Sequence, residues 1–284
     1  MRSYKILLIL LSIIIVLNII CNLNSNKNIL INNNSTYKNL IINEINDQDM
    51  IEYLKKGDIF IVRNFTNEFN YITPEYLVQL CGNYKIEAHT TINEQHAENV
   101  INITIADFFK RYKKEILYIK EDLGLIYNNS IYKQFDSKMK NYFTNLFMRY
   151  YFIWIGSRNS KTGLHNDMDD QNYLFQLYGT KKVYVFKSDD NRPFKPRIKQ
   201  EGTALLSSID FWSKEGDKLK ETVEYKEIIL NAGDILFLPK GWWHCAENIT
   251  ETIAMSCRSE TIFNIPWILY SYIFEQNKEK NNSY

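Results

Sequence analysis

Six short apolar segments follow one another between residues 148 and 261, and they limit the possible folds of this 284-residue chain more than any other feature. These candidate strands lie at residues 151–155, 173–177, 183–186, 227–230, 235–238 and 252–257. Turn-forming sequences separate them, such as Asn-Ala-Gly-Asp at 231–234 and Pro-Lys-Gly at 239–241. Many short strands with little helix between them favour an antiparallel barrel or jelly roll.

The preceding residues, 41–147, predict a mainly helical cover with one or two strands. A helix should follow Asp47-Gln48-Asp49 and run through Lys55-Lys56, and the apolar run 59–62 is typical of a buried strand. A second helix should occupy 75–81 and end at Gly82. The spacing of apolar residues over 104–115 predicts a third, amphipathic helix.

Residues 6–21 form an apolar run broken only by Ser12 and Asn18, with Arg2 and Lys5 on its N-terminal side. This pattern fits a signal peptide over residues 1–25, and it equally fits a signal anchor that tethers the chain to a membrane. Either would place the protein in the lumen of the secretory pathway or on its membrane. The Asn-rich segment 26–40 then reads as a linker.

Seven Asn-x-Ser/Thr sequons would suit a secreted glycoprotein, although about three would arise by chance in so Asn-rich a chain. They lie at Asn33, Asn34, Asn64, Asn102, Asn128, Asn248 and Asn281. The four cysteines contain no C-x-x-C pair, which argues against a zinc ribbon or a disulfide-rich mini-domain. Cys245 and Cys257 would either form a disulfide in an oxidising lumen or remain buried thiols.

The chain carries a formal net charge of +1. A protein that neutralises the phosphates of a nucleic acid needs a clustered excess of Lys and Arg, and this chain has none. The composition therefore argues against a nucleic-acid partner.

The β-rich region also contains two of the four histidines, close to turns between strands. In the sequence TGLHND at 162–167, His165 and Asp167 stand two residues apart, so their side chains share one face of an extended chain. His244 follows the candidate strand 235–238, and a neighbouring strand of a closed sheet would bring it to the same place. Two histidines and one carboxylate are the ligand set of non-haem Fe(II) oxygenases, which keeps positions open for a co-substrate and O₂.

Other polar residues carry weaker signals. Asp169 and Asp170 lack the pattern of a calcium loop and are expected to be solvated neighbours of Asp167. His89 and His96 lie in a polar segment that reads as an exposed connector, with a substrate loop as the alternative. The aromatic residues Trp154, Tyr173, Trp242 and Trp243 would either wall the iron site or belong to the core.

Taken together, TGLHND at 162–167, QNY at 171–173, GTK at 179–181 and GDILFLP at 233–239 with WWH at 242–244 resemble the JmjC/cupin-8 group of 2-oxoglutarate oxygenases. The likeness is greatest to small hydroxylases of the asparaginyl hydroxylase (factor inhibiting HIF) type and extends over roughly residues 41–264. One residue more than in that type separates Asp167 from Gln171. The resemblance implies a double-stranded β-helix, a cupin-like jelly roll over residues 148–264. An α-helical N-terminal cover at 41–147 and a C-terminal helix and tail at 265–284 would flank it, the latter suited to a homodimer.

The resemblance also implies roles for individual residues. His165, Asp167 and His244 would bind Fe(II). Lys181, rather than its neighbour Lys182, would bind the distal carboxylate of 2-oxoglutarate, with Thr162 and Asn172 as helpers. A further polar contact of the family falls among Ser256, Cys257 and Arg258.

The resulting expectation is a 2-oxoglutarate-dependent dioxygenase that uses O₂ and hydroxylates a protein substrate. A cupin barrel that binds a metal or ligand without turnover is one alternative. A membrane-anchored lysine demethylase is another, and the neutral charge weighs against it.

Overall fold

The computed structural model describes residues 43–90, 99–140, 142, 148–186, 190–197 and 204–260. The segments predicted at 1–25, 26–40 and 265–284 lie outside these ranges, as does His96. Within the described ranges, no helix has the length and apolar character needed to cross a membrane.

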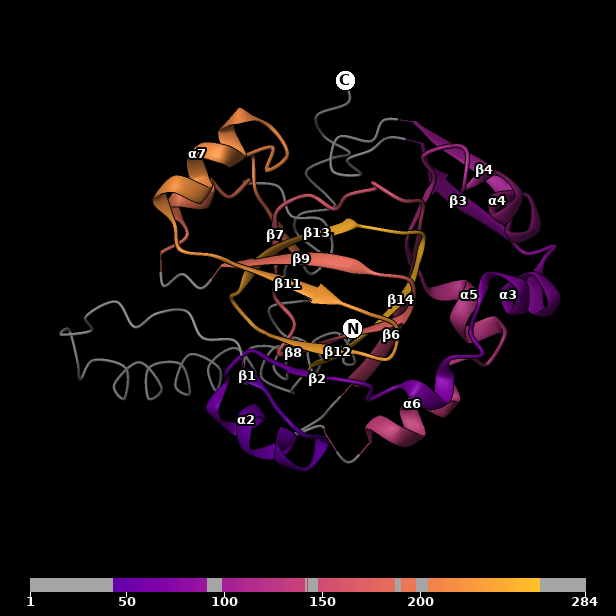
Figure 1. Cartoon of the computed structure of the whole chain (residues 1–284), viewed down its shortest axis with the longest axis horizontal. Coiled ribbons are helices and arrows are strands. Elements are labelled where there is room, and N and C mark those ends of the chain that lie inside the picture. Colours follow the sequence, from indigo (N-terminus) through magenta and orange to yellow (C-terminus); the bar gives the residue numbers. More distant parts are fainter. Residues whose placement is uncertain are drawn as a thin grey trace, which may run out of the picture.

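Two sheets dominate the fold, as the sequence predicts (Figure 1). Sheet A has nine strands in the order β1-β2-β12-β8-β14-β6-β5-β3-β4, and sheet B has five in the order β10-β7-β13-β9-β11. Nearly all neighbouring strands are antiparallel, and β1 and β2 form a parallel pair. The strands are β1 (Asn43–Glu44), β2 (Phe60–Val62), β3 (Lys85–His89), β4 (Val100–Thr104), β5 (Tyr118–Asp122), β6 (Met148–Gly156), β7 (His165–Asp167), β8 (Gln171–Tyr178), β9 (Lys181–Phe186), β10 (Ala204–Leu206), β11 (Lys226–Leu230), β12 (Ile235–Pro239), β13 (Trp243–Asn248) and β14 (Thr252–Glu260).

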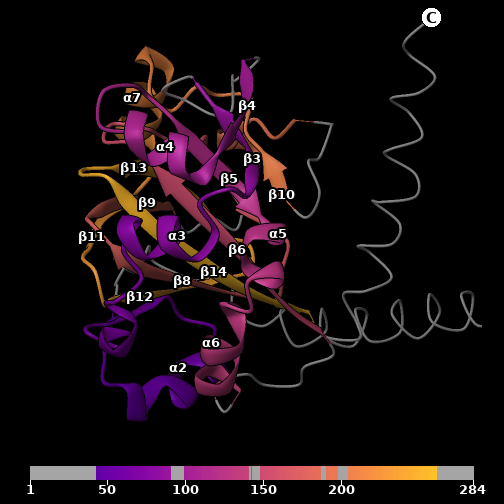
Figure 2. The ribbon, with the colours of Figure 1, turned by 90° about the vertical axis from the view of Figure 1, so that its right-hand side faces the viewer.

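The described helices lie around the sheets (Figure 2). They are α2 (Met50–Lys56), α3 (Pro74–Cys81), α4 (Ile105–Arg111), α5 (Leu123–Asn128), α6 (Tyr132–Met139) and α7 (Lys214–Thr222). The hydroxyl of Thr73 caps α3 by accepting a hydrogen bond from the Tyr76 amide, and Thr104 caps α4 in the same way through Asp107. The helix expected over 104–115 therefore starts where predicted, but it ends at Arg111.

The N-terminal part contains more β structure than predicted. Five strands, β1 to β5, precede β6, and they extend sheet A at both of its edges. β3 and β4 are not predicted from the sequence. Their alternate residues are polar, so neither strand forms a continuous apolar run. α7 is also unexpected, since it is a polar helix inserted between β10 and β11.

The three largest groups of buried apolar side chains hold the layers together. The largest lies on the outer face of sheet A, where strand residues such as Tyr151 and Phe175 meet Phe108 and Phe135 from the N-terminal helices. A smaller group lies between the sheets and joins Val183 of β9 to Leu236 of β12 with their neighbours. The third lies on the outer face of sheet B and includes aromatic residues near α7. One end of the space between the sheets is left for polar side chains.

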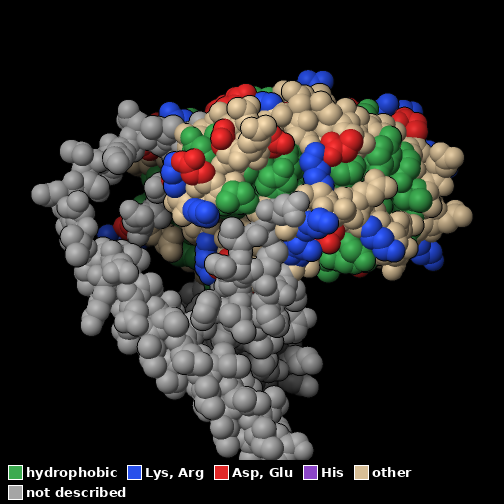
Figure 3. All heavy atoms as spheres, turned by 90° about the horizontal axis from the view of Figure 1, so that it is seen from below, with side chains coloured by type: hydrophobic (Ala, Val, Ile, Leu, Met, Phe, Trp, Pro, Cys, Tyr) green, Lys and Arg blue, Asp and Glu red, His purple; other side chains and the backbone are tan. Residues whose placement is uncertain are grey.

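On the surface seen from below in Figure 3, side chains of both charge signs are interspersed with apolar ones. One predicted glycosylation position is not at the surface: Asn248 on β13 is 1% exposed, and its amide donates to Ser160 Oγ at 2.8 Å. Because a sugar cannot be attached to a buried amide without unfolding β13, this sequon is not an acceptor in the folded protein.

Candidate metal centre

β7 and β13 bring the three predicted ligands together. The two strands are antiparallel neighbours, and His165 lies directly opposite His244 in their register. Asp167, two residues along β7, faces the same side. The potential ligand atoms of all three side chains lie within 4.8 Å of one another. Residues 79 positions apart in the chain thus form one cluster because of strand pairing alone.

Both imidazoles are oriented by main-chain carbonyl groups. His165 Nδ1 lies 2.8 Å from the Gly163 oxygen, and His244 Nδ1 lies 3.0 Å from the Trp242 oxygen. A carbonyl only accepts hydrogen bonds, so Nδ1 of each ring carries the proton and Nε2 presents its lone pair. Burial and the neighbouring His165 lower the pKa of His244 to about 4, so this ring is neutral at physiological pH.

Asp167 is 4% exposed and supplies the negative charge. Burial by itself would raise its pKa, but the positive charge of Arg258 and interactions with both histidines outweigh burial and lower the pKa to about 2. Asn172 Nδ2 donates to Asp167 Oδ2 at 2.5 Å, whereas Oδ1 is buried without a hydrogen-bond donor. Two imidazoles and an ionised carboxylate, one oxygen of which has no hydrogen-bond partner, fit a divalent metal ion such as Fe(II).

The same pocket contains the other predicted site residues. Its wall includes Thr162, Asn172 and Lys181 beside the three candidate ligands. Lys181 on β9 is 3% exposed, whereas Lys182 faces outward and pairs with Glu227 at 3.3 Å. The structure therefore places Lys181 inside the pocket and Lys182 outside it.

Thr162 and Asn172 already have partners in the pocket wall. Thr162 Oγ1 accepts a hydrogen bond from the Ala246 amide at 2.8 Å, which ties the segment before β7 to β13. The Asn172 amide holds Asp167, as described above, which makes it a partner of a candidate ligand.

The family comparison agrees with this geometry. A family model described as a cupin-like domain matches residues 52–259. The chain belongs to this cupin-like family. Several of its relatives are JmjC domain-containing proteins, and members of the family are typically Fe(II)- and 2-oxoglutarate-dependent oxygenases.

Three relatives show the range of similarity. JmjC domain-containing protein D of Dictyostelium discoideum is 23% identical over 242 residues, which cover 72% of this chain and 52% of that protein. JmjC domain-containing protein A of the same organism is 22% identical over 236 residues, 76% of this chain and 93% of that protein. HSPB1-associated protein 1 of Homo sapiens is 31% identical over 103 residues, 34% of this chain and 20% of that protein. The cupin-like chain thus spans about half of protein D and about a fifth of HSPB1-associated protein 1.

The resemblance implies a further polar contact among residues 256–258, whose side chains alternate in direction along β14. Ser256 and Arg258 line the pocket, whereas Cys257 points to the outer core of sheet A. Ser256 Oγ accepts a hydrogen bond from Trp154 Nε1 at 3.1 Å. Sequence reasoning missed Glu121, whose carboxylate lies 2.8 Å from Arg258 Nη2. No local signal marks Glu121, because only the pairing of β5 with β6 brings it to Arg258.

The structure corrects the expectation for Asp169 and selects one of the two alternatives for Cys245 and Cys257, the buried thiols. Cys245 and Cys257 are both free thiols, since one lies in the outer core of sheet B and the other in that of sheet A. Asp169 is not solvated: it is 1% exposed, accepts a hydrogen bond from the Tyr150 hydroxyl, and burial raises its pKa. Asp170 is partly exposed and faces Lys240.

The structure also places the four aromatic residues that could have lined the pocket, and His89. Trp154 lines the pocket, but Tyr173, Trp242 and Trp243 belong to three different apolar cores. His89 ends β3 and pairs with Tyr118 of β5 in the sheet register, so it is part of a strand and not an exposed connector.

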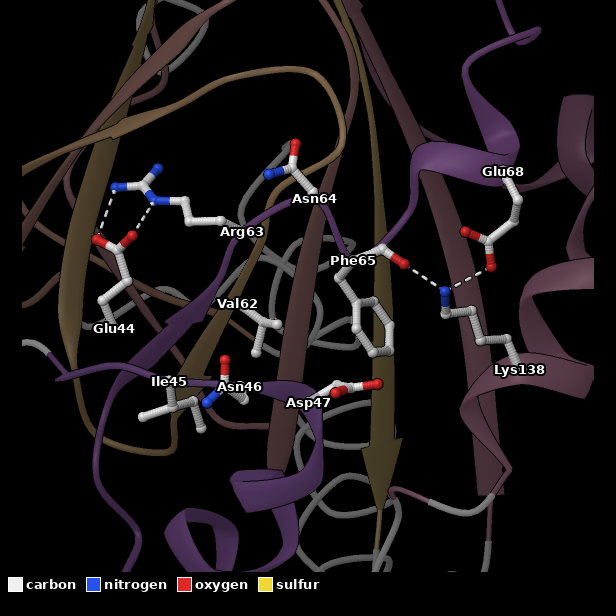
Figure 4. Close-up of a pocket in the computed structure, with 10 residues that line it drawn as sticks. All are labelled: Glu44, Ile45, Asn46, Asp47, Val62, Arg63, Asn64, Phe65, Glu68 and Lys138. Atoms are coloured by element: carbon white, nitrogen blue, oxygen red, sulfur yellow. Dashed lines mark hydrogen bonds and ion pairs between the residues drawn. The ribbon is translucent and has the colours of Figure 1, made fainter.

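A second hollow lies where β1 and β2 meet α6, away from the metal centre (Figure 4). Its cations are already paired: Arg63 Nε lies 3.1 Å from Glu44 Oε1, and Lys138 contacts Glu68 and the Phe65 carbonyl. The residues that line this hollow include no group of potential metal ligands like that of His165, Asp167 and His244.

Proposed function

We propose that this protein is an Fe(II)- and 2-oxoglutarate-dependent oxygenase that hydroxylates a protein substrate. The observation that carries the proposal is the cluster of His165, Asp167 and His244 in one pocket with the buried cation Lys181. A barrel that only held its fold would have no need to bury three potential ligands and a lysine at one place.

His165, Asp167 and His244 would hold the iron. When bound, Fe(II) and 2-oxoglutarate supply an oxidation in which O₂ gives one oxygen atom to succinate and one to a C–H bond of the substrate, with release of CO₂.

The chain's own residues contribute position and environment. The carbonyls of Gly163 and Trp242 keep both Nε2 atoms directed at the site, and Asn172 keeps the Asp167 carboxylate in place. Lys181 supplies the positive charge that a buried carboxylate of the co-substrate requires.

Apolar side chains complete the wall of the pocket. Trp154, Leu174, Val183 and Leu238 come from both sheets and limit the entry of water. Exclusion of water protects a reactive oxidant from side reactions.

The test is succinate formation by the full chain with Fe(II), 2-oxoglutarate and O₂, with and without His165→Ala. We expect the wild type to form succinate and His165→Ala to lose this activity while it remains folded. His89→Ala is the matched control, because His89 lies on β3 outside the pocket. Absence of metal binding by the wild type, or equal activity of His165→Ala, would refute the proposal.

The substrate requires a second measurement. Proteins incubated with the active wild type should gain the mass of one oxygen atom, and the same proteins incubated with His165→Ala should not. A wild type that forms succinate without modifying any protein would restrict the proposal to a small-molecule substrate.

A further inference from the structure

A buried arginine lies beside the candidate ligands on the opposite sheet. Arg258 of β14 is 3% exposed and lines the pocket. Its Nη2 atom lies 3.5 Å from Asp167 Oδ1, the carboxylate oxygen that has no hydrogen-bond donor. A permanent positive charge therefore stands next to the carboxylate that would bind a cation.

Glu121 is the carboxylate nearest to this guanidinium. Its Oε1 atom lies 2.8 Å from Arg258 Nη2, whereas the nearest oxygens of Asp167 and Asp169 lie at 3.5 and 3.6 Å. Only Glu121 is thus within ordinary hydrogen-bond distance.

The backbone at Glu121 departs from regular strand geometry. The residue has a φ of 50°, in the left-handed region that non-glycine residues seldom adopt. It lies where the register between β5 and β6 shifts, between Ile119 and Asp122. Such irregularities redirect a side chain out of the regular strand pattern, and here the N-terminal part brings a carboxylate to Arg258.

The charges have a direct consequence for cation binding. A divalent ion held by Asp167 would be repelled by the guanidinium 3.5 Å from the same carboxylate. The negative charge of Glu121 offsets that repulsion. Arg258 is shielded from solvent, whereas the Glu121 side chain is 32% exposed, so solvent weakens its effect in part.

We infer that Glu121 and Arg258 form a charge pair that sets the affinity of the His165–Asp167–His244 centre for its divalent cation. Arg258 weakens binding of the ion, and Glu121 is a positioning residue that restores it by neutralising Arg258. This inference rests on the metal centre of the proposed function, and it adds the regulation of that centre by the N-terminal part.

The test is a titration of the full chain with Co²⁺ in the absence of 2-oxoglutarate. We expect Glu121→Gln to weaken Co²⁺ binding and Arg258→Met to strengthen it, each by about tenfold, the order expected for one uncompensated charge at a partly buried site. The double variant should bind Co²⁺ with nearly the affinity of the wild type. Both single variants should lower the thermal midpoint, because each removes one partner of an ion pair whose arginine is buried.

The opposite signs separate this inference from a merely structural role. If the pair only stabilised the fold, both variants would weaken Co²⁺ binding together or leave it unchanged, and either result would overturn the inference. Glu121→Asp, which keeps the charge, should bind more tightly than Glu121→Gln, and this comparison decides the matter if Arg258→Met does not fold.

A matched control comes from another ion pair between the N-terminal part and sheet A. Arg149 of β6 pairs with Asp136 of α6 at 2.9 Å, away from the pocket. Asp136→Asn should lower stability without changing Co²⁺ affinity, and a comparable change in affinity would overturn the inference.

The titration needs no turnover, so its failure is distinct from that of the oxygenase proposal. A wild type that binds Co²⁺ but forms no succinate with Fe(II) would refute the oxygenase and leave the Glu121–Arg258 comparison fully informative. A wild type that binds no Co²⁺ would overturn both.

Discussion

The two sheets differ in what they contribute: the smaller one carries the candidate metal ligands, and the larger one carries most of the apolar core. Sheet B has five strands, two of them only three residues long, yet it provides His165, Asp167, His244 and Lys181. Sheet A has nine strands and one face of the largest apolar core, and its pocket residues Asn172 and Arg258 act on Asp167. The candidate ligands therefore lie on the smaller sheet, while the larger one contributes most to the apolar core and holds one of them, Asp167.

The sharpest way to test this division is to change one ligand on sheet B. Asp167→Asn keeps the shape of the side chain but removes the negative charge that faces the cation. We expect metal affinity to fall by more than about a hundredfold, beyond the effect typical of outer partners of a ligand, and succinate formation to disappear. Metal titration and a succinate assay check this result.

Asp170→Asn is the control for that change, because Asp170 is a nearby, partly exposed carboxylate that faces Lys240 at 3.5 Å. It should leave metal affinity unchanged. Equal losses in both variants would mean that general charge, and not ligation by Asp167, attracts the metal.

A change in the apolar core of sheet A should lower stability and leave metal affinity unchanged. Phe175 of β8 is fully buried, and its ring contacts that of Phe135 on α6 with a centroid separation of 5.6 Å. Phe175→Ala should lower the free energy of unfolding by about 3–5 kcal/mol, measured by urea denaturation. The folded fraction should bind metal with the affinity of the wild type. Loss of that affinity would show that the apolar core of sheet A also determines metal binding.

Lys181 offers a smaller effect within sheet B. Lys181→Met keeps the length of the side chain but removes the charge, so we expect the KM for 2-oxoglutarate to rise about tenfold to a hundredfold, as for the loss of one charge-assisted hydrogen bond. Metal affinity without 2-oxoglutarate should change little. Lys182→Met, on the outward face of the same strand, should leave KM unchanged, and similar effects of the two substitutions would contradict the assignment.

The smallest expected effect is a difference in the alkylation rates of Cys81, Cys245 and Cys257. These rates are measured in a Cys21→Ser background, which removes the fourth thiol. Cys81 on α3 is half-buried, and burial together with Asp122 raises its pKa to about 11. Its reaction with iodoacetamide should be slow at pH 7 and accelerate about tenfold per pH unit up to that pKa, because only the thiolate reacts. Cys245 and Cys257 should react only on unfolding and at the same urea concentration, whereas an earlier reaction of Cys245 would show that sheet B opens before sheet A.

The sequence predicts the parts of the fold that form continuous apolar runs. β6, β8, β9, β11, β12 and β14 all contain such runs and lie where expected. β7 contains only His, Asn and Asp, and its polar composition, which serves the pocket, removes the usual signal of a strand. β3 and β4 are missed for the related reason that half of their residues face water.

The candidate site is predictable to a similar extent. The grouping of His165 with Asp167 follows from strand geometry. The choice of Lys181 over Lys182 follows from the family resemblance, since the alternation of faces shows only that one of the two points inward. The partners of these residues depend on tertiary structure: Asn172 turns to Asp167, and Glu121 reaches Arg258 through a register shift that no local pattern reveals.

The way in which the N-terminal strands join sheet A also protects the protein from self-association. β2 covers the edge of β12, and β5 covers the edge of β6, so neither barrel strand offers its backbone to another molecule. A fragment that began at β6 would expose both edges, each lined with unpaired amide and carbonyl groups. Such edges recruit further strands, and the fragment should therefore aggregate even with its candidate metal ligands intact.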